Sequence, residues 1–202
     1  MQSTLRNYQY LGLIIIIWGS SFAMMHECLV GGHFTPEQTV GYRLAIGSIV
    51  LLIACIFCRK GFPKTLTPWV HFFIYAIIGN IVPFLLISRG QMHIPSGMTG
   101  LLMAFVPLVT MVLAHIFLPN NALNRYKILG FILGISGVLF ILAPSIGDGK
   151  NTVFGILLIL GAAASYASHG VVVEKFPKYD PIVAATASSI LACFLAFVIW
   201  PD

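Results

Sequence analysis

Hydrophobic residues occur along this chain in long unbroken runs, and the charged residues stand between them. A helix that crosses the hydrocarbon core of a bilayer needs about 20 largely apolar residues. Residues 38–42, before Arg43, extend the second run, and Pro95 and Pro119 bracket a span of suitable length within the fourth. The charge-free runs that predict seven spans are residues 7–26, 44–58, 65–88, 90–124, 128–147, 151–173 and 181–201.

The pattern within these runs favours helices over strands. A strand of a membrane barrel alternates in polarity over about ten residues. The run from Leu11 to Trp18, with four consecutive isoleucines, does not alternate. The sequence therefore predicts an all-α, polytopic transmembrane helical bundle of seven spans. The first run follows Arg6 without a small-x-small cleavage site, so we interpret it as a retained helix rather than a signal peptide.

Composition changes the picture by excluding a water-soluble domain. The chain is 58% hydrophobic and 8% charged, whereas a soluble domain carries about 25% charged residues. Its surface must therefore face lipid, and the lipid bilayer is its first expected partner. The net charge of +5 lies between the spans, with no basic stretch interleaved with aromatic residues, so nucleic acid is not an expected partner.

Cysteine and histidine give little support to a metal or cofactor site. Cys55 and Cys58 form a CxxC pair inside an apolar run. A zinc or redox pair needs stabilised thiolates and polar neighbours, so small apolar side chains near a helix end are the favoured interpretation. The six histidines form neither HxxxH nor HExxH, and we expect no metal and no cofactor.

The basic residues predict the orientation, because short cytoplasmic loops are enriched in Lys and Arg. With the N-terminus inside, only Arg89 and Lys150 fall on the outer side. We therefore expect an integral protein of the plasma (inner) membrane, with a cytoplasmic N-terminus and a seventh helix that ends outside. The basic residues on the inner side are Arg6, Arg59, Lys60, Lys64, Arg125, Lys127, Lys175 and Lys178.

A weak internal repeat relates the start of the chain to its end. Trp18 and Tyr166 are 148 positions apart, and Pro36 and Pro181, which each open a helix, are 145 apart. A repeat of five helices has an odd count, so a second copy would be inverted in the membrane. We expect a first five-helix repeat in residues 1–147 and the first two helices of a truncated second repeat in residues 148–202.

An ordered set of motifs resembles the EamA-type family of the drug/metabolite transporter superfamily. The motifs are Trp-Gly-Ser-Ser-Phe at 18–22, a proline then Arg43 in the second helix, Gly-Gln-Met-His-Ile-Pro-Ser-Gly at 90–97, Pro-Leu-Val-Thr at 107–110, and Gly-Phe-Ile-Leu-Gly-Ile-Ser-Gly-Val at 130–138. The resemblance implies a ten-helix carrier of two inverted repeats that exports or exchanges amino acids, related metabolites or drugs. One departure is Pro-Asn-Asn-Ala at 119–122, where the family commonly has a Gly-Glu step.

Arg43 is the strongest candidate for a functional side chain. It lies seven residues after Pro36, roughly 10 Å along a helix. Ionisable groups at depth usually face a cavity or a partner, so Arg43 could contact an anion or carboxylate in the pathway. It could instead snorkel outward or pair with Glu27 or Glu37.

The other candidates are polar or aromatic residues inside the expected spans, and each has a structural alternative. The Trp18 segment could form a substrate wall or serve helix packing beside Gly19, and Asn80 could bind substrate or satisfy a helix kinked by Pro83. Two deep histidines could couple protons or bond between helices. The pathway candidates are Trp18, Ser20, Ser21, Arg43, Asn80, Gln91, His115, Tyr166 and His169.

The leading hypothesis is a secondary transporter of small metabolites that works by alternating access. An intramembrane enzyme is disfavoured because the spans lack aspartate and because Ser168 and His169, as neighbours, point to different sides of a helix. A non-transporting or partner-dependent subunit stays open. So do proton or ion coupling and a homodimer, for which the Gly130, Gly134 and Gly137 row offers a packing face.

Overall fold

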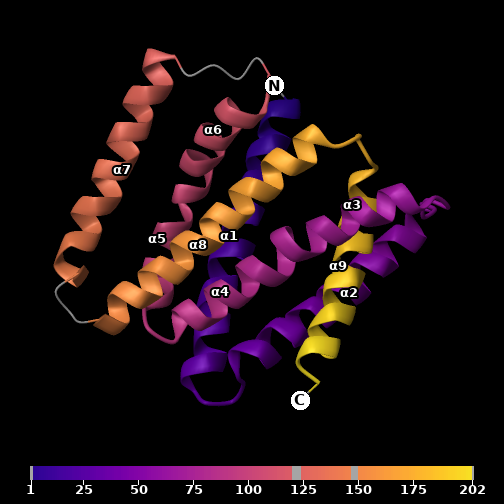
Figure 1. Ribbon diagram of the computed structural model, residues 1–202, viewed down its shortest axis with the longest axis horizontal. Helices are drawn as coiled ribbons and strands as arrows, with labels where there is room; N and C mark the ends of the chain where they lie inside the picture. Colours follow the sequence, from indigo (N-terminus) through magenta and orange to yellow (C-terminus); the bar gives the residue numbers. More distant parts are fainter. Residues whose placement is uncertain (1, 120–123, 147–149, 202) are drawn as a thin grey trace.

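The computed structural model describes residues 2–119, 124–146 and 150–201, and within these ranges the chain forms helices and no strand (Figure 1). The predicted all-α class is therefore confirmed. The helices are α1 (Gln2–Val30), α2 (Pro36–Phe57), α3 (Leu66–Ala76), the π-helix η1 (Ile77–Ile81), α4 (Val82–Gln91), α5 (Ser96–Met103), α6 (Phe105–Phe117), α7 (Arg125–Ile146), α8 (Lys150–Lys175) and α9 (Pro181–Ile199).

Six helical segments of the described chain are long and apolar enough to cross a membrane. Helix α7, with 22 residues, occupies most of the predicted fifth span. The predicted boundary residues 120–123 and 147 lie outside the described residues. The number of seven spans stays a prediction. The six segments are Arg6–Val30, Pro36–Phe57, Leu66–Gln91, Ser96–Phe117, Thr152–Lys175 and Pro181–Ile199.

Helices α2 and α9 begin in the same way. Thr35 caps α2 by accepting a hydrogen bond from the Gln38 amide, and Asp180 caps α9 by accepting from the Ile182 amide. Each cap is followed directly by a proline, whose missing N–H costs nothing in the first turn of a helix. The capping residue and proline therefore explain locally why both helices start where they do.

The third span contains a π-helical turn at η1, and proline explains how it is accommodated. The Val82 amide bonds to the Ile77 carbonyl, five residues back. In the same register the next donor would be residue 83, but Pro83 has no N–H. The Ser165 hydroxyl of α8 donates to the Ile78 carbonyl at 2.7 Å instead. The widened turn is thus satisfied by a side chain from another helix, as a membrane interior requires.

Helices α4 and α8 cross at two glycines. A Cβ on Gly90 would lie 3.3 Å from the Gly155 carbonyl oxygen, and a Cβ on Gly155 would lie 3.1 Å from the Gly90 carbonyl oxygen. The two backbones are therefore in direct contact. Since Ser165 meets Ile78 farther along, residue numbers fall on α4 as they rise on α8, and the helices run antiparallel.

Helices α2 and α9 also pack antiparallel. A Cβ on Gly41 would lie 3.9 Å from the Phe197 ring, near one end of the pair. Near the other end, the Thr186 hydroxyl shares its proton between the Ile182 carbonyl of its own helix at 2.7 Å and the Leu51 carbonyl of α2 at 3.2 Å. Between them the hydroxyl oxygens of Ser48 and Ser189 are 2.9 Å apart in a buried contact. Small and hydroxylated residues thus bring these helices close together, as is common in membranes.

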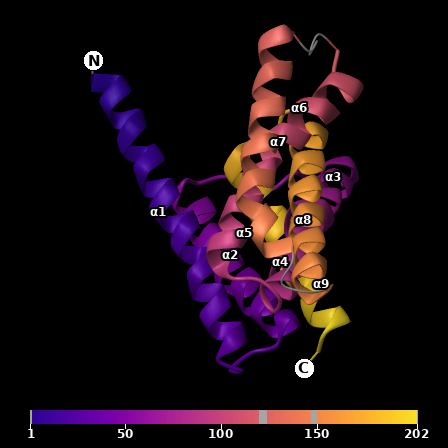
Figure 2. The ribbon, with the colours of Figure 1, turned by 90° about the vertical axis from the view of Figure 1, so that its left-hand side faces the viewer.

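Helix α1 packs along only part of its length. Phe22, Met25 and Leu29 are buried against the bundle, whereas the segment from Leu11 to Trp18 is largely exposed. Figure 2 shows the N-terminal half of α1 leaning away from the other helices. The exposed apolar side chains of this half suit a lipid environment.

Candidate functional site

The site forms around Arg43, where α2 packs on α4 and α4 in turn packs on α8. The Arg43 guanidinium carbon lies 4.3 Å from the centre of the Phe84 ring, within the range of a cation–π contact. The Phe84 ring in turn meets the Tyr166 ring edge to face, with centroids 6.4 Å apart. Two of the sequence candidates, Arg43 and Tyr166, are therefore brought together by the fold.

The depth of this cluster follows from the helix ends around it. The Ser88 hydroxyl donates to the Pro36 carbonyl at 3.1 Å, so the start of α2 and the end of α4 lie at the same side of the bundle. Arg43 is seven residues inward from Pro36, and Phe84 is seven residues inward from Gln91, the last residue of α4. The guanidinium consequently stays roughly 10 Å from the helix ends. It points across the bundle toward α4.

An ion pair between Arg43 and Glu37 was one sequence alternative, and the structure gives Glu37 a different partner. The Arg89 guanidinium binds Glu37 with a nearest N–O distance of 2.7 Å. No carboxylate of the described residues lies within 4.0 Å of Arg43. The half-buried guanidinium therefore has an aromatic neighbour but no anionic partner within the described chain.

His169 and Asn80 lie beside the π-helical turn. The His169 ring packs edge to face on Tyr75, with centroids 5.3 Å apart, and a Cβ on Gly79 would lie 2.8 Å from it. The Asn80 amide donates to the Tyr75 carbonyl in a long contact of 3.5 Å. Asn80 thus contacts the backbone of its own span, whereas the carbonyl that Pro83 leaves without a donor is bound by Ser165.

The remaining candidates lie apart from Arg43. Trp18 is 53% exposed and lines an apolar groove that includes Pro107, and the Ser20 hydroxyl bonds to the Ile17 carbonyl of its own helix. Ser21 is half-buried and His115 is exposed on α6. Gln91, the last residue of α4, is fully buried and donates to the Phe22 carbonyl at 3.0 Å, which ties α4 to α1.

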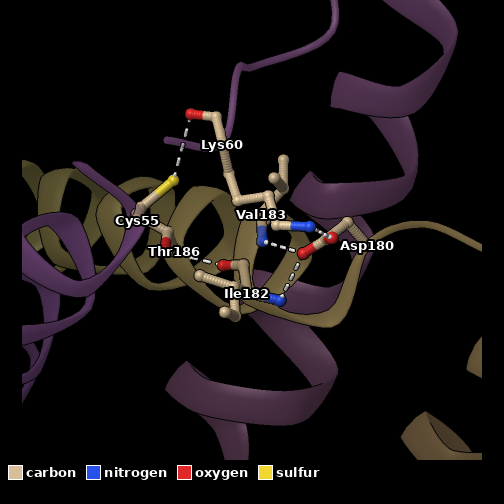
Figure 3. A network of polar contacts seen from close by, with 6 residues as sticks. All are labelled: Cys55, Lys60, Asp180, Ile182, Val183 and Thr186. Carbon is tan, nitrogen blue, oxygen red and sulfur yellow. Dashed lines mark hydrogen bonds and ion pairs between the residues drawn. The ribbon is translucent and has the colours of Figure 1, made fainter. Parts of the chain in front are cut away.

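A polar network at the other end of α2 was missed by the sequence analysis (Figure 3). The Lys60 ammonium binds the Asp180 carboxylate at 2.6 Å, while the second oxygen of that carboxylate accepts the cap bonds of α9. Nearby, the His71 ring nitrogen and the Tyr179 hydroxyl are 2.5 Å apart. The Asp-Pro step signalled the cap, but its pairing with a residue 120 positions away left no signal.

The cysteine pair shows no metal-site geometry. Cys55 is buried with its thiol directed at the Lys60 carbonyl at 3.6 Å, whereas Cys58 is exposed at the end of α2. Within residues 2–119, 124–146 and 150–201, no three His, Cys, Asp or Glu side chains gather as a metal site would require. The arrangement offers a charged and aromatic contact inside a helical bundle, where an ionisable residue commonly marks a functional site.

Comparison with known proteins assigns this membrane protein to a class of transporters. The model of the EamA-like transporter family matches residues 6–143, which is most of the chain. The chain therefore belongs to the EamA-like transporter family, and the resemblance seen in its motifs is confirmed.

Curated relatives of this chain are also named as transporters. The chain is 28% identical over 188 residues to the uncharacterized transporter YdfC of Bacillus subtilis, covering 93% of this chain and 57% of the relative. It is 29% identical over 176 residues to the uncharacterized transporter YoaV of the same organism, covering 86% and 59%. It is 25% identical to a probable amino-acid metabolite efflux pump of Salmonella typhimurium, covering 84% and 54%. The chain thus spans little more than half the length of these relatives.

The fold of this chain is similar to that of a protein whose crystal structure is known. The likeness has a TM-score of 0.59 at 20% identity and covers 92% of this chain and 67% of the other. At this identity the likeness shows the shared helical architecture alone.

Proposed function

We propose that this chain carries part or all of the path of a secondary transporter for small metabolites, such as amino acids or related compounds. The observation that carries the proposal is the Arg43–Phe84–Tyr166 cluster, a cation and two rings from three helices at depth in a member of a transporter family. Charged groups at depth are costly and are typically retained where they serve a pathway. Arg43 and Tyr166 would line that path, with Asn80 at the π-helical turn.

Seven spans and an inverted second repeat belong to the same proposal, and helix direction supports them. Two spans of one chain run antiparallel only when their positions in the order of spans differ by an odd number. Helices α2 and α9 are antiparallel, as the Gly41–Phe197 and Leu51–Thr186 contacts indicate. In the order of spans α2 is second, and α9 is seventh if α7 crosses the membrane but sixth if it does not. Only the first order gives the odd difference that antiparallel spans need. The matching caps of α2 and α9, 145 positions apart at Thr35 and Asp180, support the repeat with boundaries at 1–147 and 148–202.

The Lys60–Asp180 pair has a natural role in alternating access. Lys60 follows the second helix of the first repeat, and Asp180 opens the second helix of the proposed second repeat. The pair therefore joins the two repeats at one end of the bundle. We place this end in the cytoplasm, because it carries Arg59, Lys60 and Lys64, and we assign the protein to the plasma membrane. Opening toward the cytoplasm would break the pair.

Two further parts of the proposal concern coupling and assembly. Proton coupling would use His169, which lies against the π-helical turn, or His115 on α6. A homodimer would use the glycine face of α7. The first is tested by flux with and without a pH gradient, and the second by the mass of the protein in detergent.

Reconstitution into proteoliposomes tests the transport function. We expect saturable flux of amino acids or related metabolites by the full chain, and lower flux after Tyr166→Phe, which removes only the hydroxyl from the ring that packs on Phe84. The exposed Tyr8→Phe is the matched control and should leave flux unchanged. Absence of saturable flux for the folded chain would contradict the proposal and favour a non-transporting or partner-dependent subunit.

A further inference from the structure

Arg43 stands out in the distribution of charge along the spans. Every other charged residue in the described helices lies within about four residues of a helix end, as Glu27, Glu37 and Arg89 do. Arg43 lies seven residues inside α2. It is therefore the one charge of the described chain that sits well inside a span, where an uncompensated ion is most costly.

Three acidic residues at or beside helix ends form ion pairs with cations other than Arg43. Glu37 pairs with Arg89, Glu174 with Lys178 four residues later, and Asp180 with Lys60. None of the hydrogen bonds among the described residues involves the Arg43 side chain. A guanidinium has five donors in one plane. The Phe84 ring lies 4.3 Å from the guanidinium carbon, and a cation–π contact of this kind uses none of the five donors.

We propose that Arg43 binds the carboxylate of the transported metabolite. This inference rests on the proposed transport function and names the substrate class for the same site. A carboxylate accepts two parallel hydrogen bonds from the guanidinium fork, and the pair is neutral as a whole. Phe84 and Tyr166 would fix the fork from the side of α4 and α8.

The charge count favours a carboxylate over a phosphate. A phosphate monoester carries about −1.5 to −2 at pH 7, so a single guanidinium leaves part of its charge unbalanced. No second cation among the described residues lies well inside a span beside Arg43. A monocarboxylate matches the single positive charge of the site.

The test compares each carboxylate with its own amide, which has the same shape without the charge. The probes are radiolabelled acetate, benzoate, L-leucine and L-phenylalanine, each with its amide, chloride and inorganic phosphate as competitors, on the full chain in detergent. We expect at least one carboxylate to bind about tenfold or more tightly than its amide, and neither chloride nor phosphate to displace it. Equal binding of every acid and amide would overturn the inference, as would displacement by chloride or phosphate at concentrations equal to the probe.

The variants assign the binding to Arg43. Arg43→Gln should remove the preference for acid over amide, and Arg43→Lys should keep part of it, because the charge remains while the fork is lost. Arg125→Gln, which removes an exposed arginine at the start of α7, is the control and should keep the preference. If Arg43→Gln does not fold, Arg43→Lys decides alone, since an unchanged preference in that variant would contradict bidentate binding.

Failure of this inference is distinguishable from failure of the transport function. Saturable flux of amines or amides with no acid preference would leave the transporter standing and reject the carboxylate. Acid-selective binding that depends on Arg43, without saturable flux in proteoliposomes, would support the site and reject transport by this chain.

Discussion

The Ser165 hydroxyl of α8 donates to the Ile78 carbonyl at 2.7 Å, and that carbonyl is the acceptor that Pro83 leaves without an amide donor. The third span therefore keeps its π-helical turn with help from the sixth predicted span. A local feature of the sequence, the proline that follows an asparagine-containing turn, is thus linked to a contact between two residues 87 positions apart.

Ser165→Ala should destabilise the protein by roughly 1 kcal/mol, since interhelical hydrogen bonds in membranes are worth about 0.6–2 kcal/mol. The measurement is unfolding in detergent as denaturant is increased. Ser168→Ala is the matched control, because the Ser168 hydroxyl bonds to the Ala164 carbonyl of its own helix. Similar losses in the two variants would show that the contact with Ile78 is not special.

Gly79→Ala should be destabilising because the new methyl would lie 2.8 Å from the His169 ring. Overpacking of this kind costs about 1–3 kcal/mol. In a His169→Ala background the same substitution should cost clearly less, so a double-mutant cycle of thermal stability measures the coupling. Gly137→Ala on α7 meets nothing within 4 Å and serves as the control. Additive effects of Gly79→Ala and His169→Ala would contradict the contact.

Cysteines at positions 48 and 189 should form a disulfide, because the two serine hydroxyl oxygens are 2.9 Å apart. The experiment uses Ser48→Cys and Ser189→Cys with the four native cysteines replaced by alanine, followed by oxidation and mass spectrometry of blocked thiols. Ser48→Cys with Ser188→Cys is the control, since the Ser188 hydroxyl bonds to the Ala185 carbonyl of its own helix. Equal cross-linking of both pairs would reject the packing of α2 on α9.

The Lys60–Asp180 pair should make stability depend on pH at both extremes. The hydrogen bond from Lys60 lowers the pKa of Asp180 below its ordinary value of 3.8, and the bond to Asp180 raises the pKa of Lys60 above 10.5. A carboxyl with a lowered pKa contributes stability above its ordinary value and loses it as pH falls through the lowered one. A raised ammonium pKa contributes below its ordinary value and loses that as pH rises. The pair therefore stabilises the fold between about pH 4 and 10.

Two substitutions at position 180 separate the ion pair from the helix cap. Asp180→Asn retains a good capping side chain and removes the charge, so its melting temperature should approach that of the wild type below about pH 4 and above pH 10. Asp180→Ala should lose about 1 kcal/mol more, because alanine cannot cap α9. Added salt should shrink the difference between wild type and Asp180→Asn, since both side chains are partly exposed. A difference that is the same at every pH and salt concentration would exclude the ion pair as its source.

The sequence predicted those parts of the fold that depend on local composition. Long apolar runs predicted the spans, and the prolines at 36 and 181 predicted where α2 and α9 begin, because a helix of about 20 apolar residues is nearly self-sufficient in lipid. Pro83 and Asn80 also indicated an irregular third span. The donor that completes it, Ser165, could not be foreseen, because the distance between spans in the sequence says nothing about which helices are neighbours.

The candidate site was predicted in part. Arg43 was singled out from its depth alone, and Tyr166 from the repeat, but neither signal paired them or identified Phe84 between them. Gln91 was a pathway candidate, and the structure shows it at the end of α4, buried and bonded to α1. The sequence could not show this contact, because it does not indicate which backbone carbonyl of another helix accepts from an amide side chain.

The crossing of α4 and α8 at Gly90 and Gly155 has a consequence for how this sequence can vary. A Cβ added at either glycine would lie within 3.3 Å of the carbonyl oxygen of the other, so neither residue can be replaced alone. Because the obstacle is a backbone oxygen, replacing the side chain of the partner creates no room. At most packed positions a second substitution can compensate for the first. This is not possible at Gly90 and Gly155, because each added Cβ would meet a backbone atom of the other residue. In a randomised library selected for folded protein, positions 90 and 155 should both stay glycine, whereas Gly97, which meets nothing within 4 Å, should accept many residues.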